Sequence, residues 1–239
     1  MEASAGRSEA VRWATSPSLR PAANLDKSRY VYAANAMRRY GAAFPGSLVF
    51  DVGAGDDGMR QDAEKAGLKW RGFDLDPRYP GIHRWDLSTP CPAEEKAAIV
   101  LMLDVIEHMV NPGLAFCNVA QAMKPGAILI LTAPNPRWSR SRVHALLHGY
   151  PACFTQSDLD NNGHVFTPWP HVMLKLLADA GFAIEEYVTL DGKTVWPWPP
   201  SSLNYPLRLA HAAINKAIEW GDPSACGMSF GMLARRMET

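Results

Sequence analysis

The chain has 239 residues, 47% of them hydrophobic and 20% charged, which is the composition of an ordinary globular domain. Its 24 Lys and Arg residues balance 24 Asp and Glu residues, so nucleic acid, whose binding relies on neutralised phosphates, is not an expected partner. The chain contains no run of about 18 apolar residues, so no membrane span is predicted. The four cysteines form no Cys-x-x-Cys pair and the first residues lack the apolar stretch of a secretory signal, which favours a cytoplasmic location.

The N-terminal part of the chain differs in pattern from the rest. Residues 1 to about 28 carry Ser, Ala, Pro and Arg without periodicity and are expected to form a tail. An amphipathic pattern over residues 30–44 predicts a helix, which Pro45-Gly46 ends. We therefore expect a tail and a helix in residues 1–45 and one domain in residues 46–239.

Beyond residue 46, apolar runs of strand length alternate with helical patterns. This alternation predicts parallel strands joined by right-handed crossovers, in a doubly wound α/β sheet that helices cover on both faces. A Trp-Pro-rich stretch with Trp196 and Trp198, followed by a helical pattern over 203–220, predicts a cap insertion at about 191–225. The expected strands are 48–52, 70–73, 98–103, 127–132, 183–190 and 228–235, and the expected helices between them are 59–66, 114–123 and 170–180.

A glycine-rich turn at residues 53–58 follows the first expected strand. Glycines at a strand-to-helix turn let the backbone approach a ligand closely. The spacing of Gly53, Gly55 and Gly58 also matches the fingerprint of dinucleotide-binding proteins. However, Asp51 stands where dinucleotide-binding strands keep an apolar residue. Asp74 ends the next strand, where a ribose diol would lie, and Asp86 ends the third segment, where it can take an adenine amino group.

These segments, with Asp104-Val-Ile-Glu-His108 and Lys124-Pro-Gly-Ala-Ile-Leu-Ile-Leu-Thr-Ala-Pro, resemble the class I S-adenosylmethionine-dependent methyltransferases. Within that family the resemblance is to the branch of ubiquinone-biosynthesis O-methyltransferases. It implies a Rossmann-like fold with a mostly parallel seven-stranded sheet and an antiparallel last strand. It also implies S-adenosylmethionine as the cofactor.

The same resemblance implies a role for each residue of the glycine-rich side. Gly53 and Gly55 would cradle the methionine part of the cofactor, and Asp51 would help to orient it. Asp74 would accept hydrogen bonds from the ribose hydroxyls, which as charge-assisted bonds contribute about 1.5–3 kcal/mol each. The remaining expected cofactor contacts are Asp86, Leu87, Ala54, Leu75 and Leu103.

The strand over 98–103 ends in a second cluster of polar residues. Because parallel sheets bind ligands at the carboxyl ends of their strands, this is where we expect the methyl acceptor. With a helical turn starting near Val105, Asp104, Glu107 and His108 occupy positions i, i+3 and i+4 and converge. Such a set suits a divalent cation that also takes acceptor oxygens, and His164 is a fourth candidate ligand.

The cluster resembles the Glu-x-x-Glu-His…His metal site of small-RNA 2′-O-methyltransferases, with Asp104 in place of the first Glu. The resemblance implies a site for Mg²⁺, Mn²⁺ or Zn²⁺. Two other interpretations stay open. His108 or His164 could act directly as the general base without a metal, or the motif could only hold the loop and the amino end of the cofactor.

For the function as a whole, the sequence predicts O-methylation of a small hydroxylated acceptor, such as a phenol or a sugar, with or without a metal. N- or C-methylation and a non-catalytic regulatory protein that binds S-adenosylmethionine are the alternatives. The basic segment at 137–142 is either an anion-binding element near the acceptor or a solvated helix start. Cys117, within an apolar helical pattern, is expected to be buried.

Overall fold

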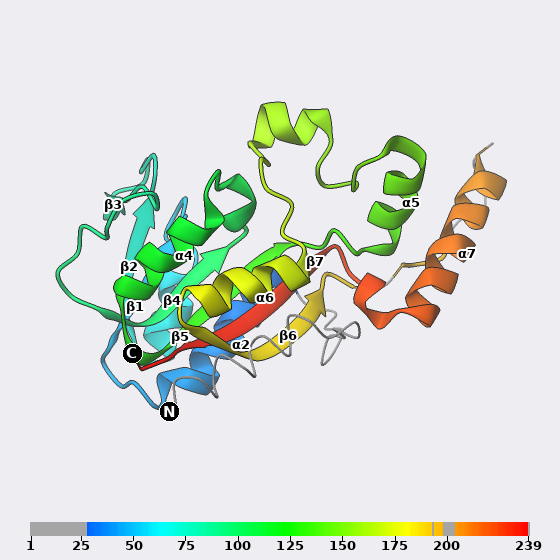
Figure 1. Cartoon of the computed structure of the whole chain (residues 1–239). Coiled ribbons are helices and arrows are strands. Elements are labelled where there is room, and N and C mark those ends of the chain that lie inside the picture. Colours follow the sequence, from blue (N-terminus) through cyan, green and yellow to red (C-terminus); the bar gives the residue numbers. More distant parts are fainter. Residues whose placement is uncertain (1–27, 193, 198–203, 239) are drawn as a thin grey trace, which may run out of the picture.

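The computed structural model describes residues 28–192, 194–197 and 204–238. Its centre is a seven-stranded sheet in the order β3-β2-β1-β4-β5-β7-β6 (Figure 1). Strands β1 to β5 are parallel, and β7 is antiparallel to both of its neighbours, which confirms the predicted mostly parallel α/β sheet. The strands are β1 (Leu48–Val52), β2 (Lys69–Asp74), β3 (Ile82–Arg84), β4 (Ala97–Leu103), β5 (Met123–Pro134), β6 (Phe182–Leu190) and β7 (Ser229–Arg236).

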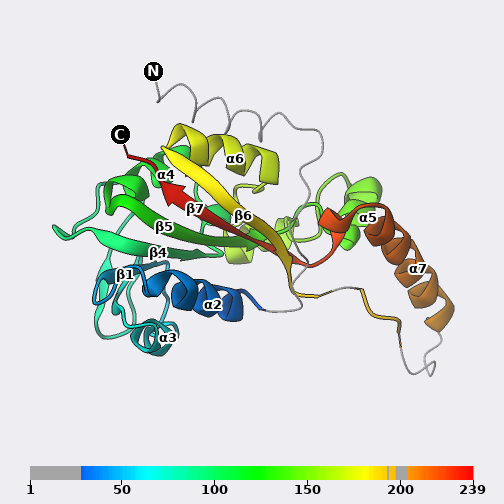
Figure 2. The ribbon, with the colours of Figure 1, turned by 90° about the horizontal axis from the view of Figure 1, so that it is seen from below.

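Helices cover both faces of the sheet, α2 and α3 on one side and α4 and α6 on the other (Figure 2). No helix in the described ranges is long and apolar enough to cross a bilayer. The α-helices are α2 (Arg29–Gly41), α3 (Arg60–Lys65), α4 (Pro112–Gln121), α5 (Ser139–His148), α6 (Pro170–Asp179) and α7 (Tyr205–Gly221). The short turns are η1 (Ile106–His108), η2 (Asp158–Asn162) and η3 (Pro223–Ala225).

The core is split into two layers by the sheet. Successive side chains of a strand point to opposite faces, so Phe50 and Val52 of β1 join the layer under α4 and α6, while Val49 joins the layer under α2. Strands β4 and β5 are buried on both faces, which is why their sequences are continuous apolar runs. The core thereby fixes the strands whose carboxyl ends carry the polar clusters.

Helix α2 belongs to this core. Its buried face carries Ala33 and Met37, and the Ser28 side chain accepts a hydrogen bond from the backbone N–H of Val31 at its start. The expected tail before Ser28 lies outside the described residues, as does Trp198 of the Trp-Pro-rich stretch. Cys117 is exposed on α4, so the prediction of a buried thiol was wrong, because the apolar pattern of this helix is wider than its buried face.

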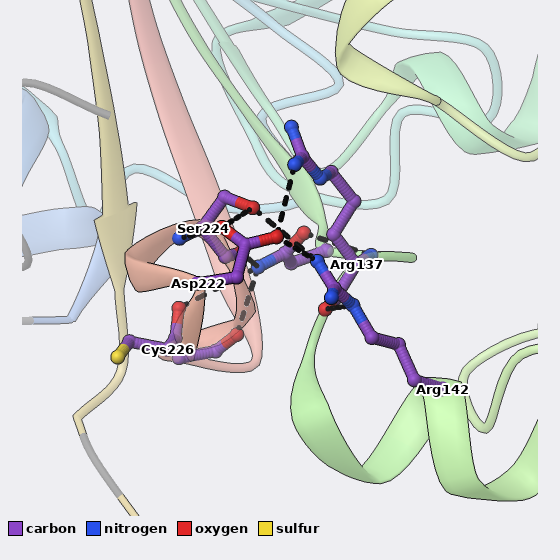
Figure 3. Close-up of polar contacts among 7 residues, drawn as sticks. Arg137, Arg142, Asp222, Ser224 and Cys226 are labelled. Atoms are coloured by element: carbon purple, nitrogen blue, oxygen red, sulfur yellow. Dashed lines mark hydrogen bonds and ion pairs between the residues drawn. The ribbon is translucent and has the colours of Figure 1, made fainter. Parts of the chain in front are cut away.

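Helices α5 and α7 pack together beside the sheet rather than on it (Figure 1). We call α5, α7 and η3 the cap. Asp222 joins its two halves, because its carboxylate accepts hydrogen bonds from Arg137, from Arg142 and from the backbone N–H of Ser224 (Figure 3). The helix at 203–220 was predicted. Its partner α5 begins in the basic segment at 137–142, for which a helix start was one of the two interpretations.

Candidate active site

The predicted site residues gather along one edge of the sheet. Strands β1 to β4 are parallel, so the loops after them start at the same edge. Gly53 and Gly55 follow β1, Asp74 ends β2, Asp86 follows β3, and the segment from Asp104 follows β4. The edge therefore carries glycine backbone and carboxylates on one part and a mixed acid–imidazole cluster on the next.

The glycine loop is held by backbone contacts to β2. Gly53 and Gly55 both have positive φ, 71° and 63°, which glycine adopts without strain. The N–H groups of Gly53 and Ala54 both donate to the carbonyl of Phe73, at 2.8 and 3.0 Å. A Cβ on Gly53 would lie 2.4 Å from Val105 Cγ2, whereas a Cβ on Gly55 would meet nothing within 4 Å. Gly53 is therefore required for packing, and the backbone at Gly55 borders open space.

Asp74 is the anchor of the neighbouring loop. Its two carboxylate oxygens accept the backbone N–H groups of Gly55 and Asp76, each at 3.0 Å. The side chain is only partly buried, and a carboxylate oxygen has room for a second donor. Asp74 is thus preoriented beside the glycine loop with acceptor capacity left for a diol.

Asp51 lies deeper, on the α2 side of the sheet. Its Oδ2 accepts a hydrogen bond from Trp70 Nε1 at 3.1 Å, and the Trp70 ring covers Gly72 of the neighbouring strand. Burial raises the Asp51 pKa to about 6, against the lowering effect of the Trp70 bond and with further raising by the charges of Asp56 and Asp74. The carboxylate is therefore a buried charge below the glycine loop.

The third loop places the residues expected around an adenine. Asp86 is exposed, and its Oδ1 accepts the Ser88 backbone N–H at 2.8 Å, a bond that lowers the Asp86 pKa. Leu87 is buried, and its carbonyl accepts a hydrogen bond from the buried Asn118 side chain at 2.8 Å. Asn118 was not identified from the sequence because it lies inside an apolar helical pattern.

Two of the expected apolar contacts differ in exposure. Leu103 is partly buried at the end of β4, and Leu75 is among the exposed large apolar side chains, next to Asp74. An apolar side chain that is exposed beside a polar loop is available to contact an apolar part of a ligand.

Asp104 begins the turn after β4 with a left-handed backbone, φ 54°. Its Oδ1 accepts the Thr132 hydroxyl at 2.7 Å, and its Oδ2 is ion-paired with Arg29 of α2. Both oxygens are therefore engaged in holding α2 and β5 against this turn. These contacts could not be predicted from the sequence, because Arg29 and Thr132 are far from Asp104 along the chain.

Glu107, His108 and His164 form a compact group beyond Asp104. One ligand atom from each lies within 4.8 Å of the other two, and the two imidazole rings meet edge to face at 5.1 Å. His164 Nδ1 is 2.8 Å from the Cys153 carbonyl, which can only accept, so Nδ1 carries the hydrogen and Nε2 is left with its lone pair. The structure thus brings together three of the four predicted metal ligands and leaves Asp104 bound elsewhere.

The electrostatics of this group are unusual for exposed loops. Glu107 is 1% exposed, and its Oε2 has no hydrogen-bond partner among the described residues. Burial, and then the charge of Asp104, raise the Glu107 pKa to about 8. Burial and the neighbouring His164 lower the His108 pKa, so this imidazole is mostly neutral at neutral pH. A buried acid without a hydrogen-bond partner among the described residues, next to two imidazoles, has the chemistry of a cation site.

The comparisons with known proteins agree with this geometry. A model of the family described as "Methyltransferase domain" matches residues 25–187. No curated protein matches the chain.

Among solved structures, one similar fold is an S-adenosylmethionine-dependent methyltransferase from Archaeoglobus fulgidus, 16% identical, with a TM-score of 0.54 over 87% of this chain and 95% of that one. Another is a putative methyltransferase from Bacillus halodurans, 15% identical, with a TM-score of 0.55 over 87% and 100%. The cyclase SpnF is 14% identical, with a TM-score of 0.52 over 87% and 82%. At such identities the structures establish the fold alone.

The family model spans most of the sheet and all the loops that carry the glycine turn, Asp74, Asp86 and the Glu107 group. The fold and the arrangement of its loops agree with that match. The chain belongs to the methyltransferase domain family and is an S-adenosylmethionine-dependent enzyme.

Proposed function

We propose that this methyltransferase methylates a hydroxyl oxygen of a small acceptor, such as a phenol or a sugar, with the help of a divalent cation. The observation that carries the proposal is the buried, unpartnered Oε2 of Glu107 beside His108 and His164. Because a buried acceptor without a partner is costly, its retention at the carboxyl edge of the sheet is best explained by a ligand. Mg²⁺, Mn²⁺ and Zn²⁺ are the candidate cations.

The residues present fit S-adenosylmethionine at the neighbouring loops. Gly53, Ala54 and Gly55 would hold its methionine part, because the backbone there is open to a ligand at Gly55. Asp74 would accept the ribose hydroxyls, and Asp51 would add a negative charge below a cationic ligand. When bound, the cofactor supplies an activated methyl group. The contacts expected further along the edge are Asp86, Leu87, Leu75 and Leu103.

The residues of the metal group have distinct tasks. Glu107 would supply the anionic oxygen, because binding of the cation would displace the proton that the raised pKa keeps on the acid. His164 would bind through Nε2, with its ring orientation fixed by the Cys153 carbonyl. The cation would lower the pKa of an acceptor hydroxyl and fix its position. Asp104 would act at a distance, by keeping the turn after β4 in its left-handed conformation through Arg29 and Thr132.

One observation supports a metal-free version of the same reaction. His108 has a lowered pKa and is exposed, so a neutral imidazole is accessible to accept the proton of an acceptor hydroxyl. N- or C-methylation would need neither the cation nor this base. The metal titration below separates the first version from the others.

A calorimetric titration of the purified protein with Mn²⁺ tests the proposal. We expect one cation per chain, and Glu107→Gln should weaken its binding by at least tenfold, because the amide keeps the shape and removes the charge. His164→Ala should weaken it similarly, and His171→Ala, an exposed histidine of α6, is the matched control. Equal Mn²⁺ affinity in the parent and in both site variants would rule out this metal site.

The four cysteines bear on the compartment. They form no Cys-x-x-Cys pair, which favours a reducing environment, and we propose a cytoplasmic location.

A further inference from the structure

Helix α7 is turned with its apolar face outward. Leu207 is 74%, Ile214 51% and Trp220 92% exposed. At 100° per residue these side chains, with the exposed alanines between them, cover the side of the helix that faces away from α5. A surface helix normally buries this side.

The polar side of α7 is the buried one. Asn215 and Glu219 are buried against the rest of the cap. The Glu219 carboxylate accepts hydrogen bonds from the Ser139 hydroxyl at 2.9 Å and from the backbone N–H of Thr194 at 3.3 Å. Because these bonds would be lost if the helix rotated, the outward position of the apolar face is specified by the sequence.

Helix α5 of the cap also exposes large apolar side chains. Leu146 and Leu147, in the last turn of α5, are 86% and 69% exposed. Scattered single apolar residues on a surface are normal, but several large ones on two packed helices indicate a binding surface. We call the exposed apolar side chains of α5 and α7 the cap surface.

The exposed charged side chains of α5 and α7 are all cationic. Glu219 is the only carboxylate in α5 and α7, and it is buried and hydrogen-bonded. The cationic side chains Arg140 and Arg208 are exposed, and Lys216 is partly exposed. At 100° per residue Arg208 lies on the side of the buried Glu219, while Lys216 borders the apolar side of α7 and Arg140 shares a side of α5 with Leu147. The cap surface is therefore flanked by the cations Arg140 and Lys216, and no carboxylate of α5 or α7 is exposed.

We propose that the cap binds the surface of an anionic lipid bilayer, with the apolar face of α7 entering the headgroup region and the cations contacting lipid phosphates. An amphipathic helix with this distribution lies in the plane of a bilayer rather than across it. A second copy of the chain is a poorer occupant, because a twofold contact would bring like charges together. The proposal is independent of the methyl acceptor.

The cap lies close to the candidate active site. Helix α5 starts five residues after the end of β5, and η3 leads into β7 opposite that same end, where Ser229 pairs with Pro134. The cap thus adjoins the edge of the sheet that carries the site. A bound bilayer would lie close to that edge.

Vesicle co-sedimentation of the full chain tests the proposal. The parent should bind vesicles of phosphatidylcholine with phosphatidylglycerol and bind pure phosphatidylcholine at least tenfold more weakly. Replacing Leu207, Ile214 and Trp220 together by Ser should lower binding to the anionic vesicles at least tenfold. Tyr79→Ser, an exposed aromatic residue of the β2–β3 loop, is the matched control and should bind as the parent does.

Two further measurements separate the contribution of the cations to vesicle binding from that of the apolar side chains. Arg140→Glu with Lys216→Glu should lower binding to anionic vesicles by roughly tenfold or more and leave binding to neutral vesicles unchanged. The emission of the parent should shift to the blue on anionic vesicles, and this shift should be smaller in Trp220→Phe. Far-ultraviolet circular dichroism should be the same for all variants, because the replaced side chains are exposed.

Three outcomes would overturn the proposal. The parent could remain in the supernatant with both kinds of vesicle, or the triple Ser variant could sediment as the parent does. Sedimentation velocity could also show a dimer that the triple Ser variant abolishes, without binding to vesicles, which would assign the cap surface to a second copy of the chain.

Discussion

Burial of the Asp51 carboxylate lowers the free energy of unfolding, and the same carboxylate is proposed to contribute to cofactor binding. Its folded pKa is raised from the ordinary 3.8 to about 6, chiefly by burial. Between pH 4 and 6 the folded chain therefore holds a proton that the unfolded chain releases. The free energy of unfolding falls as the pH rises through this window, by about 3 kcal/mol for this one group.

Asp51→Asn should remove this cost while keeping an oxygen for Trp70 Nε1. We expect the variant to unfold at higher denaturant concentration than the parent at pH 7.5 and at the same concentration at pH 4. The variant should also bind S-adenosylmethionine more weakly. Urea titrations at the two pH values measure the first effect, and a parent that is the more stable protein at pH 7.5 would contradict it.

Asp74 should be the more important of the two carboxylates in its loop. Asp74→Ala removes the proposed ribose acceptor and two backbone bonds, so binding of S-adenosylhomocysteine should weaken by about 1.5–3 kcal/mol for each ribose bond lost. Asp76→Ala is the matched control, because Asp76 is exposed and pairs with the exposed Arg78 in the same loop. Calorimetry that finds equal losses for both variants would exclude a specific role of Asp74.

At the residue scale, the sequence predicted positions better than partners. Glu107, His108 and His164 come together as expected, since their types and the edge of the sheet could both be inferred. The pairing of Asp104 with Arg29 could not, because it joins α2 to a turn that is 75 residues away in the chain. Spacing along one segment gives no information about a side chain from another layer.

At the scale of elements, the cap depends on one carboxylate. Asp222 accepts from Arg137, Arg142 and Ser224, and these contacts keep its pKa well below the usual value (Figure 3). Asp222→Ala should therefore loosen the attachment of α5 and α7 while β4 and β5 stay intact. Hydrogen exchange should become faster in α5 and α7 and remain unchanged in the sheet.

A matched control for this change is Glu64→Ala, which removes the exposed pair with Arg60 on α3. Such a pair contributes little to stability, so exchange should be unaffected throughout the chain. Protection of α5 and α7 that is the same in Asp222→Ala as in the parent would show that the cap is held by its other contacts.

The elements themselves followed from periodicity where the core imposes it. The expected strand at 48–52 matches β1 in full, and β4 and β6 differ by one residue at the start. For α5 the sequence indicated only a helix start as one of two interpretations, because its buried residues are Ser139 and Ser141, and Ser139 donates a hydrogen bond to Glu219 of α7. A hydrophobic pattern cannot reveal an interface that is built from hydroxyl groups.

For the whole molecule, the fold restricts the chemistry without fixing it. The sheet order and the family match establish a methyltransferase domain, yet a cyclase has a similar fold. We expect atom and acceptor specificity to depend on side chains at the carboxyl edge of the sheet and on the cap beside it. These are the parts in which long-range contacts, and not local patterns, decide the structure.

The central claim is that the glycine loop, Asp74 and Asp86 form an S-adenosylmethionine site. Titration calorimetry with S-adenosylhomocysteine tests it most directly, because the demethylated product binds without an acceptor. The account predicts one site per chain with a dissociation constant on the order of micromolar, a rise in the unfolding temperature with ligand, and no binding of NAD. Binding of NAD together with no binding of S-adenosylhomocysteine would contradict it.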